Sequence, residues 1–532
     1  MNVNAKRDNS RIKEIEIMDC TLRDGEQTNG VSFLPHEKLM IARMLLHDIN
    51  VDRIEVASAR VSEGEKDAVA RICRYAKTIG KLDSVEVLGF VDNNKSVDWI
   101  AECGGHVINL LAKGSYKHCT QQLKMSLEEH LAHIKQTIDY ALSKGFTVNL
   151  YLEDWSSGMR DSRDYLFMMM DELVKLPIKR FLLPDTLGIL NPLQCVEYMR
   201  QMVRRYPNSH FDFHAHNDYD LAVSNSLAAV LSGAKGLHVT VNGLGERCGN
   251  APLASVQVIL KDMFEAKTNI KEDRLNDISR LVEGYSGIAV APNTPVVGDN
   301  VFTQVAGVHA DGDNKDKLYC NNLVPERFGR HREYALGKNS GKANIVQNLN
   351  ELGLELTPEQ TKAVTKRITE LGDRKELVTQ DDLPYIVSDV LKHGAPEDKV
   401  KLVSYMVSTS YGLKPIASVK VEIEGKEYED QSSGDGQYDA FVKALRNIYK
   451  VKLGKTFPKL DNYQVTIPPG GRTDALVQTV ITWREGERIW RTRGLDADQT
   501  EAAIKATLKM INMYEADKSD EQAVSPRNLD ME

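Results

Sequence analysis

The segment IEIMDCTLRDGEQ, residues 15–27, decides between the two folds that the order of strands and helices in this chain allows. Its apolar start, IEIMD, predicts a buried strand. In an open, doubly wound sheet, a glycine-rich phosphate loop would be expected after this first strand. The charged turn CTLRDGEQ follows instead. Charged groups at strand ends are typical of the catalytic face of a closed barrel, so the segment favours a barrel.

Seven further apolar or β-branched runs continue this pattern, and amphipathic segments separate them. The segment 126–145 has clear helix signals, because Ser126 and Glu129 can form a capping box and Gly145 follows the last apolar position. Eight such units predict an α/β fold, a (β/α)8 TIM barrel over residues 1–285. The seven runs are RIEVAS (53–58), SVEVLGF (84–90), HVINLLA (106–112), TVNLYLE (147–153), RFLLPD (180–185), HFDFHAH (210–216) and LHVTVNG (237–243).

The pattern changes twice after the expected barrel. Residues 286–400 contain two expected helices and predict small helical linker subdomains. Residues 401–515 hold two or three strands followed by a helix, twice in succession, which predicts an α+β C-terminal domain. Residues 516–532 are polar and acidic, and we expect a disordered tail there.

Composition limits the partners of the chain. Its 532 residues are 42% hydrophobic, without the run of roughly 18 apolar residues that argues a membrane span. The net charge of -8 argues against nucleic-acid binding over the whole surface. The polar N-terminus lacks the apolar stretch of a secretory signal, which predicts a cytoplasmic location. We therefore expect neither a nucleic-acid nor a membrane partner.

The segment HAHND carries the clearest candidates for metal ligands. His214 and His216 are two apart on an expected strand, so they point to the same side of the sheet and can meet one divalent cation. Asp24, after the first strand, would complete a carboxylate–imidazole set that leaves positions open for a substrate. Zn, Mn and Mg all fit such donors. The histidines can also be ordinary strand-end residues, and Arg23 and Asp24 can form a surface ion pair.

Three other polar residues are candidates for the same site. Asn250 in NGLGERCGN could supply an amide oxygen to the metal or cap a helix. Glu153, at the end of the fifth expected strand, could act as a base or orient one. His309 in AGVHADGD lies beyond the expected barrel, in a segment typical of a mobile loop that could reach over the site.

Four motifs together resemble those of the metal-dependent barrel enzymes that condense acetyl-CoA with 2-oxo acids, the isopropylmalate, citramalate and homocitrate synthases. They are TLRDGEQ, HAHNDYDLAVSNSL, NGLGERCGN and FTQVAGVHADGD. The resemblance covers nearly the whole chain, because the family also carries linker subdomains and a C-terminal regulatory domain. Within the family the chain looks most like the citramalate synthases, in segments such as VLGFVDNNKSVDWI and FLLPDTLGIL. The family's more usual DTTLRDG reads DCTLRDG here, which places Cys20 near the expected ligands.

The resemblance implies a role for each motif. It assigns the metal to Asp24, His214 and His216, with Asn250 near or in the coordination sphere. It also implies a homodimer in which the C-terminal domains pair and bind the amino acid at the end of the pathway, here isoleucine.

The resemblance likewise implies a set of residues that meet the substrates. Arg23 would face the carbonyl oxygen of the oxo acid, and Thr186 would bind its carboxylate. Glu153 and His309 would take the proton from the acetyl methyl group, with His309 coming from the partner subunit of a domain-swapped dimer. Tyr319 would lie near acetyl-CoA.

Substrate size is expected to depend on three residues near strand ends. If Leu88, Leu111 and Tyr151 point inward, they narrow the space beside the oxo acid and favour pyruvate, with its methyl group, over 2-oxoisovalerate; otherwise the leucines are simply barrel core. One methylene group in an apolar pocket changes the free energy that separates two substrates by only about 1–3 kcal/mol. Selection against larger oxo acids would therefore depend on steric exclusion.

The expected activity is therefore (R)-citramalate synthesis from acetyl-CoA and pyruvate, inhibited by isoleucine. The alternatives are 2-isopropylmalate or homocitrate synthesis, a lyase that cleaves a 3-hydroxyacyl-CoA on the same barrel, and a regulator that binds an amino acid without catalysis. The regulatory domain argues against the simple lyase, and the complete set of metal ligands argues against the silent regulator.

Overall fold

The protein forms two compact units, Met1–Thr303 with Asp316–Glu333, and Gln304–Lys315 with Tyr334–Glu532. The computed structural model describes residues 14–306, 309, 312, 318–352, 354–373, 378, 380–391, 399–466, 477–486 and 488–524.

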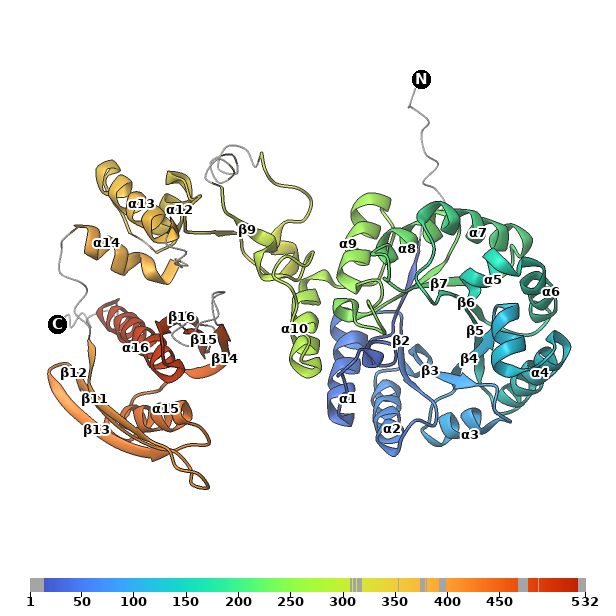
Figure 1. Ribbon diagram of the computed structural model, residues 1–532, viewed down its shortest axis with the longest axis horizontal. Helices are drawn as coiled ribbons and strands as arrows, with labels where there is room; N and C mark the ends of the chain where they lie inside the picture. Colours follow the sequence, from blue (N-terminus) through green and yellow to red (C-terminus); the bar gives the residue numbers. More distant parts are fainter. Residues whose placement is uncertain are drawn as a thin grey trace, which may run out of the picture. The chain divides into compact units, whose positions relative to one another are not determined.

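Eight parallel strands of the first unit close into a barrel in their order along the chain (Figure 1). Because β8 pairs with both β7 and β1, this sheet has no free edge. The closed sheet confirms the expected TIM barrel, and each expected strand overlaps one of the eight. They are β1 (Glu16–Asp19), β2 (Arg53–Ser58), β3 (Val85–Phe90), β4 (Val107–Lys113), β5 (Thr147–Glu153), β6 (Arg180–Asp185), β7 (Phe211–Ala215) and β8 (Gly236–Val239).

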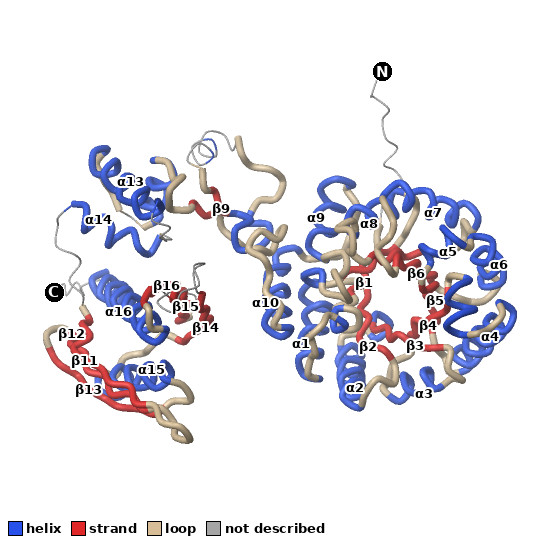
Figure 2. The backbone as a smooth tube through the Cα atoms, viewed as in Figure 1, coloured by secondary structure: helices blue, strands red, loops and turns tan. Residues whose placement is uncertain are grey.

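Helices surround the strands of the barrel (Figure 2). The capping box expected for α4 is present, since Ser126 Oγ accepts the N–H of Glu129 and the Glu129 carboxylate accepts the N–H of Ser126. No helix in the described part of the chain is long and apolar enough to cross a membrane. The helices of this unit are α1 (Pro35–Arg43), α2 (Glu63–Thr78), α3 (Lys95–Glu102), α4 (Leu127–Ser143), α5 (Trp155–Asp161), α6 (Arg163–Leu173), α7 (Pro192–Arg205), α8 (Ala222–Leu231), α9 (Leu253–Phe264) and α10 (Leu275–Ser286).

The second unit begins with small helices and continues with the expected repeat. The short strands β9 (Thr303–Gln304) and β10 (Glu333–Tyr334) pair with each other. Buried apolar residues hold α12, α13 and α14 together. Each half of the repeat is a three-stranded antiparallel sheet followed by a helix, and one apolar core joins the halves. The elements are α12 (Lys342–Glu351), α13 (Pro358–Asp373), α14 (Leu383–Leu391), β11 (Val400–Ser408), β12 (Ile416–Ile423), β13 (Lys426–Ser433), α15 (Gln437–Asn447), β14 (Lys459–Thr466), β15 (Val477–Glu485), β16 (Arg488–Asp496) and α16 (Gln499–Val524).

Two features of the second unit differ from the sequence-based expectation. The sequence singled out no strand at residues 400–408, where β11 lies, and a register shift between Leu402 and Ser404 interrupts the alternation that marks a strand there. Helix α16 continues to Val524, past the start of the expected disordered tail. Residues 525–532 of that tail lie outside the described residues.

An ion network crosses the interior of the barrel near the start of its strands. Arg53 of β2 is 3% exposed, and its Nη2 donates to Asp212 Oδ2 of β7 at 2.5 Å. Its Nη1 donates to Glu86 Oε1 of β3 at 3.2 Å, and both carboxylates are fully buried. Buried carboxylates are tolerated only when a cation and hydrogen bonds compensate them, so Arg53 keeps this end of the barrel stable.

Replacing Arg53 with Met should lower the free energy of unfolding of the barrel by about 3–5 kcal/mol, because two buried carboxylates lose their cation. Urea denaturation followed by circular dichroism measures the change. The matched control is Arg205→Met, because the pair of Arg205 with Asp171 is about half exposed and should contribute little. Equal losses for the two variants would contradict this account.

Candidate active site

The expected metal ligands come from loops and strand ends on one face of the barrel. The carbonyl of Cys20 accepts the backbone N–H groups of Arg23, Asp24 and Gly25, so the chain folds into a tight turn directly after β1. This turn presents Asp24 toward β7, which carries His214, and His216 follows that strand. All three ligand side chains are buried.

The three side chains converge without forming a complete hydrogen-bond network. Asp24 Oδ2 lies 3.0 Å from His214 Nε2 and 3.8 Å from His216 Nε2. The two Nε2 atoms are 3.4 Å apart. Within the described residues, neither oxygen of Asp24 and neither Nδ1 of the two histidines has a hydrogen-bond partner of good geometry. A buried carboxylate without hydrogen-bond partners, facing two converging imidazole Nε2 atoms, fits a bound cation.

Burial and charge set these groups in the protonation states that a metal requires. Burial works to raise the pKa of Asp24, but Arg23 and the two histidines outweigh it and hold that pKa well below its ordinary value. Burial lowers the pKa of His216 to about 4 and also lowers the pKa of His214. At neutral pH the carboxylate is therefore ionised and both imidazoles are neutral, as in metal sites.

Asn250 lies beside these ligands and has an unused acceptor. It forms an antiparallel bridge with His216, and its Nδ2 donates to the Leu244 carbonyl at 3.2 Å. Its buried Oδ1 has no hydrogen-bond partner among the described residues. A side chain at Gly245, where φ is +159°, would collide with the Asn250 amide. The glycine-rich segment thus permits the tight backbone that places the Asn250 amide beside His216.

Arg23 is held by two partners besides Asp24. Its Nη1 lies 3.2 Å from Asp24 Oδ2, its Nε donates to Glu55 Oε2 at 2.5 Å, and its Nη2 donates to Tyr151 Oη at 3.2 Å. The sequence reasoning missed Glu55. The available signal was a carboxylate between Ile54 and Val56 in RIEVAS, a strand that is almost entirely buried.

The residues expected to limit substrate size form one apolar cluster. Leu88 and Tyr151 pack together with Leu182, and Leu111 packs against them. The sequence reasoning missed Leu182, which belongs to β6 and is fully buried. Because Tyr151 Oη accepts a hydrogen bond from Arg23, this cluster begins beside the guanidinium.

Thr186 and Glu153 lie at the ends of neighbouring strands and have partners of their own. The Thr186 hydroxyl oxygen accepts the Asp154 N–H at 2.9 Å. Glu153 forms an ion pair with Lys113, which is its direct neighbour in the register of β4 and β5. The side chain of Glu153 is 24% exposed, and Lys113 was not predicted as its partner.

The remaining two candidates lie apart from this group in the chain. His309 belongs to the second unit, so its expected approach to Glu153 stays a prediction. Tyr319 belongs to the first unit and is 47% exposed. Its expected contact with acetyl-CoA also stays a prediction.

Three family models match consecutive parts of the chain. The HMGL-like model covers residues 14–282, the homocitrate synthase post-HMGL domain-like model covers 296–376, and the LeuA allosteric (dimerisation) domain covers 377–515. Among curated proteins, the (R)-citramalate synthase of Methanocaldococcus jannaschii is 34% identical over 94% of this chain and 99% of its own length. The 2-isopropylmalate synthase of the same organism is 36% identical over 94% of each chain.

The chain belongs to the citramalate and 2-isopropylmalate synthase family. This synthase is therefore an acyltransferase of the class that condenses acetyl-CoA with 2-oxo acids. Members of the family are generally metal-dependent, which agrees with the convergence of Asp24, His214 and His216.

Loss of an outer-shell partner of a metal ligand weakens metal binding by about 10–100-fold. The substitution Asp24→Asn should weaken Mn2+ binding by more than this, because it removes the only anionic ligand of the proposed set. Calorimetric titration with MnCl2 measures the affinity. The control is Asp218→Asn, because Asp218 pairs with Arg247 at 2.7 Å and is not one of the converging ligands. Unchanged Mn2+ affinity in Asp24→Asn would rule out this metal site.

Proposed function

We propose that this synthase is an (R)-citramalate synthase, which condenses acetyl-CoA with pyruvate and hydrolyses the resulting thioester. The observation that carries the proposal is the apolar cluster of Leu88, Leu111, Tyr151 and Leu182 beside Arg23. If Arg23 binds the keto oxygen, the 2-oxo acid places its alkyl group near this cluster. Bulky side chains there favour a methyl group over an isopropyl group.

Overall similarity does not choose between the two main substrates. Relatives named for citramalate and for 2-isopropylmalate synthesis are 34% and 36% identical to this chain over the same share of it. Synthesis of 2-isopropylmalate from 2-oxoisovalerate is therefore the second candidate. The choice depends on the few residues around the alkyl group.

In the proposed mechanism each step is assigned to a side chain. Asp24, His214, His216 and Asn250 would hold the metal, which when bound supplies Lewis-acid polarisation of the keto group. Arg23, fixed by Glu55, stabilises the negative charge that develops on the keto oxygen. Because the Thr186 oxygen already accepts the Asp154 N–H, its hydroxyl proton can be donated to the substrate carboxylate.

Proton removal from the acetyl methyl group is assigned to Glu153 and His309. The ion pair with Lys113 holds the Glu153 carboxylate at the end of β5. We propose that His309 comes from the partner subunit of a homodimer, a proposal supported by the match of residues 377–515 to a dimerisation domain. Deprotonation creates the carbon nucleophile, which attacks the keto carbon.

We also propose a cytoplasmic location, since acetyl-CoA is an intracellular metabolite.

The proposed specificity is tested by comparing pyruvate with 2-oxoisovalerate, following the release of free CoA thiol. Pyruvate should have the higher kcat/KM. Leu111→Ala should shift the ratio toward 2-oxoisovalerate by about tenfold, which is within the range for one or two methylene groups. Leu110→Ala is the matched control, because Leu110 lies next to Leu111 on β4 but packs in the main core outside this cluster. A wild-type preference for 2-oxoisovalerate would reverse the assignment.

We further propose that isoleucine inhibits the enzyme by binding the C-terminal domain, as expected for the first step of a threonine-independent isoleucine pathway. A cavity of about 780 Å³ lies between the two halves of the repeat. Apolar side chains and the start of two helices, α15 and α16, line it. Such a cavity is large enough for an amino acid, with apolar groups for its side chain and polar groups for its charged ends.

Filling this cavity should weaken inhibition by isoleucine and leave the catalytic activity intact. Leu460→Trp places a large side chain in the cavity, so the isoleucine concentration for half-inhibition should rise at least about tenfold, as expected when a ligand loses more than about 1.4 kcal/mol of binding free energy. The control Leu413→Trp adds the same side chain at an exposed position outside the cavity. Full inhibition of the Leu460→Trp variant would place the effector elsewhere.

A further inference from the structure

A chain of buried hydrogen bonds connects Arg23 with the ion network at the other end of the barrel. Arg23 Nη2 donates to Tyr151 Oη at 3.2 Å. Tyr151 Oη lies 3.1 Å from His238 Nδ1, and His238 Nε2 lies 3.2 Å from Asp212 Oδ2. Tyr151, His238 and Asp212 are at most 3% exposed, so water does not compete for these bonds. His238 has no role in the mechanism described above.

The charges at the end of this chain fix the direction of each hydrogen bond. Asp212 forms a buried ion pair with Arg53, whose Nη2 lies 2.5 Å from Asp212 Oδ2, so Asp212 is a carboxylate. In the neutral ring of His238, one nitrogen carries a proton and the other is an acceptor. An ionised carboxylate only accepts, and therefore His238 Nε2 carries the ring proton and donates to Asp212. His238 Nδ1 is left as an acceptor.

The hydroxyl proton of Tyr151 then has two acceptors within reach. One is His238 Nδ1 at 3.1 Å, and the other is Glu55 Oε2 at 3.3 Å. Glu55 is already engaged, because Oε2 accepts from Arg23 Nε at 2.5 Å and Oε1 accepts from Asn109 at 2.7 Å. A proton donated to His238 leaves the Tyr151 oxygen and the Glu55 carboxylate both available to Arg23.

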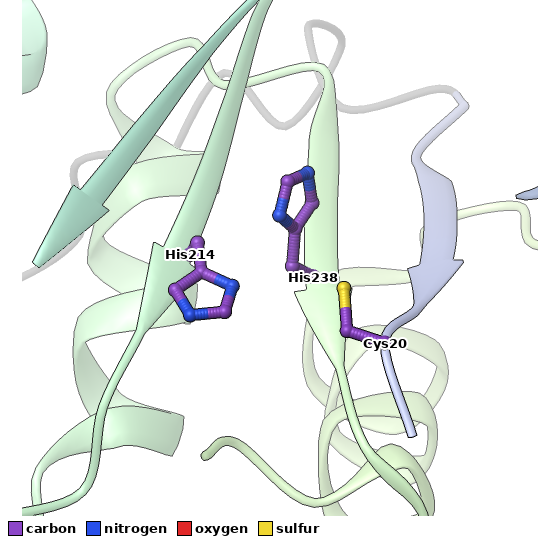
Figure 3. A group of neighbouring side chains, drawn as sticks. All are labelled: Cys20, His214 and His238. Atoms are coloured by element: carbon purple, nitrogen blue, oxygen red, sulfur yellow. The ribbon is translucent and has the colours of Figure 1, made fainter. Parts of the chain in front are cut away.

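A second explanation for His238 is a metal site, and its hydrogen bonds argue against it. Figure 3 shows His214 on β7, His238 on β8 and Cys20 after β1, and each offers a ligand atom within 4.8 Å of the others. Both ring nitrogens of His238 already have partners. We assign His238 to the hydrogen-bonded chain.

We propose that His238 is a positioning residue that acts on Arg23 through Tyr151: it accepts the Tyr151 hydroxyl proton and so keeps Tyr151 from competing with Arg23 for Glu55. Its effect on the reaction rests on the proposed function, because that function assigns the keto oxygen to Arg23. Without an acceptor at this position, Tyr151 donates to Glu55 and loosens the guanidinium.

The test is a double-mutant cycle of His238→Leu and Tyr151→Phe, with kcat/KM for pyruvate as the readout. His238→Leu should lower kcat/KM by about 10-fold or more, as expected when one buried hydrogen-bonding partner is removed. In the Tyr151→Phe background the same substitution should cost less than about twofold, because the proton that His238 accepts is absent. Comparable losses in the two backgrounds would overturn the proposal.

Two further variants separate positioning from a general effect on stability. His238→Asn keeps an acceptor near the place of Nδ1, so it should recover most of the activity that His238→Leu loses. His210→Asn removes the other histidine that contacts Asp212, with Nε2 2.9 Å from Oδ1, but leaves Tyr151 untouched. It should retain most of its activity, because Arg53 and His238 still hold Asp212. If His238→Asn is as inactive as His238→Leu while both variants are folded by circular dichroism, the proposal is wrong.

Two measurements do not depend on turnover. Calorimetric titration with MnCl2 should give His238→Leu an affinity within about twofold of the wild type, because His238 is not one of the proposed ligands. Loss of Mn2+ binding would make His238 a ligand instead.

Nitrogen-15 NMR of the protein with labelled histidine should show the ring proton of His238 on Nε2. The signal of His238 is identified by its absence from the spectrum of His238→Asn. A proton on Nδ1 refutes the proposal, whereas a wild type that does not turn over pyruvate refutes only the proposed substrate.

Discussion

Compensation of buried charge around Arg23 is the interaction on which the rest of the site depends. Asp24 and Glu55 are both buried, and Arg23 lies between them within 3.2 Å and 2.5 Å. A single guanidinium cannot balance two carboxylates, so this cluster keeps an excess of negative charge. The neighbouring imidazoles are neutral and add none of the missing positive charge. A divalent cation beside Asp24 would remove the imbalance, and this explains why such costly groups are kept inside the protein.

Closure of the barrel is what brings these groups together. Asp24 follows β1 and His214 lies on β7, so nearly the whole barrel sequence separates them. In an open sheet with the strands in this order, β1 and β8 would be opposite edges. In the closed barrel β8 pairs with both β1 and β7, which places the first-strand turn beside the seventh strand. The register of the same sheet aligns Lys113 with Glu153 at the mouth of the barrel.

The sequence alone predicted those parts of the structure that depend on local patterns. Apolar runs predicted all eight barrel strands, and the capping box at Ser126 predicted the start of α4. Glu55 and His238 were missed as site residues, because strand alternation gives a side chain's face but not its partners across the barrel. Lys113 was missed for the same reason, since its partner is set by the register of two strands. The proposed approach of His309 would involve a second unit and a partner subunit, and no local pattern encodes such an approach.

In the proposed mechanism, Tyr151 links the choice of substrate to the geometry of catalysis. Its ring packs with Leu88 and Leu182 in the apolar cluster, while its hydroxyl group binds Arg23 and lies beside His238. A change of Tyr151 therefore alters the space for the alkyl group and the position of the guanidinium at once. Leu88 and Leu111 touch only the apolar side of this arrangement, so their size can change without disturbing Arg23. In the proposed arrangement, substitutions at the leucines change the space for the alkyl group, while Tyr151 and its hydrogen-bonded chain stay fixed.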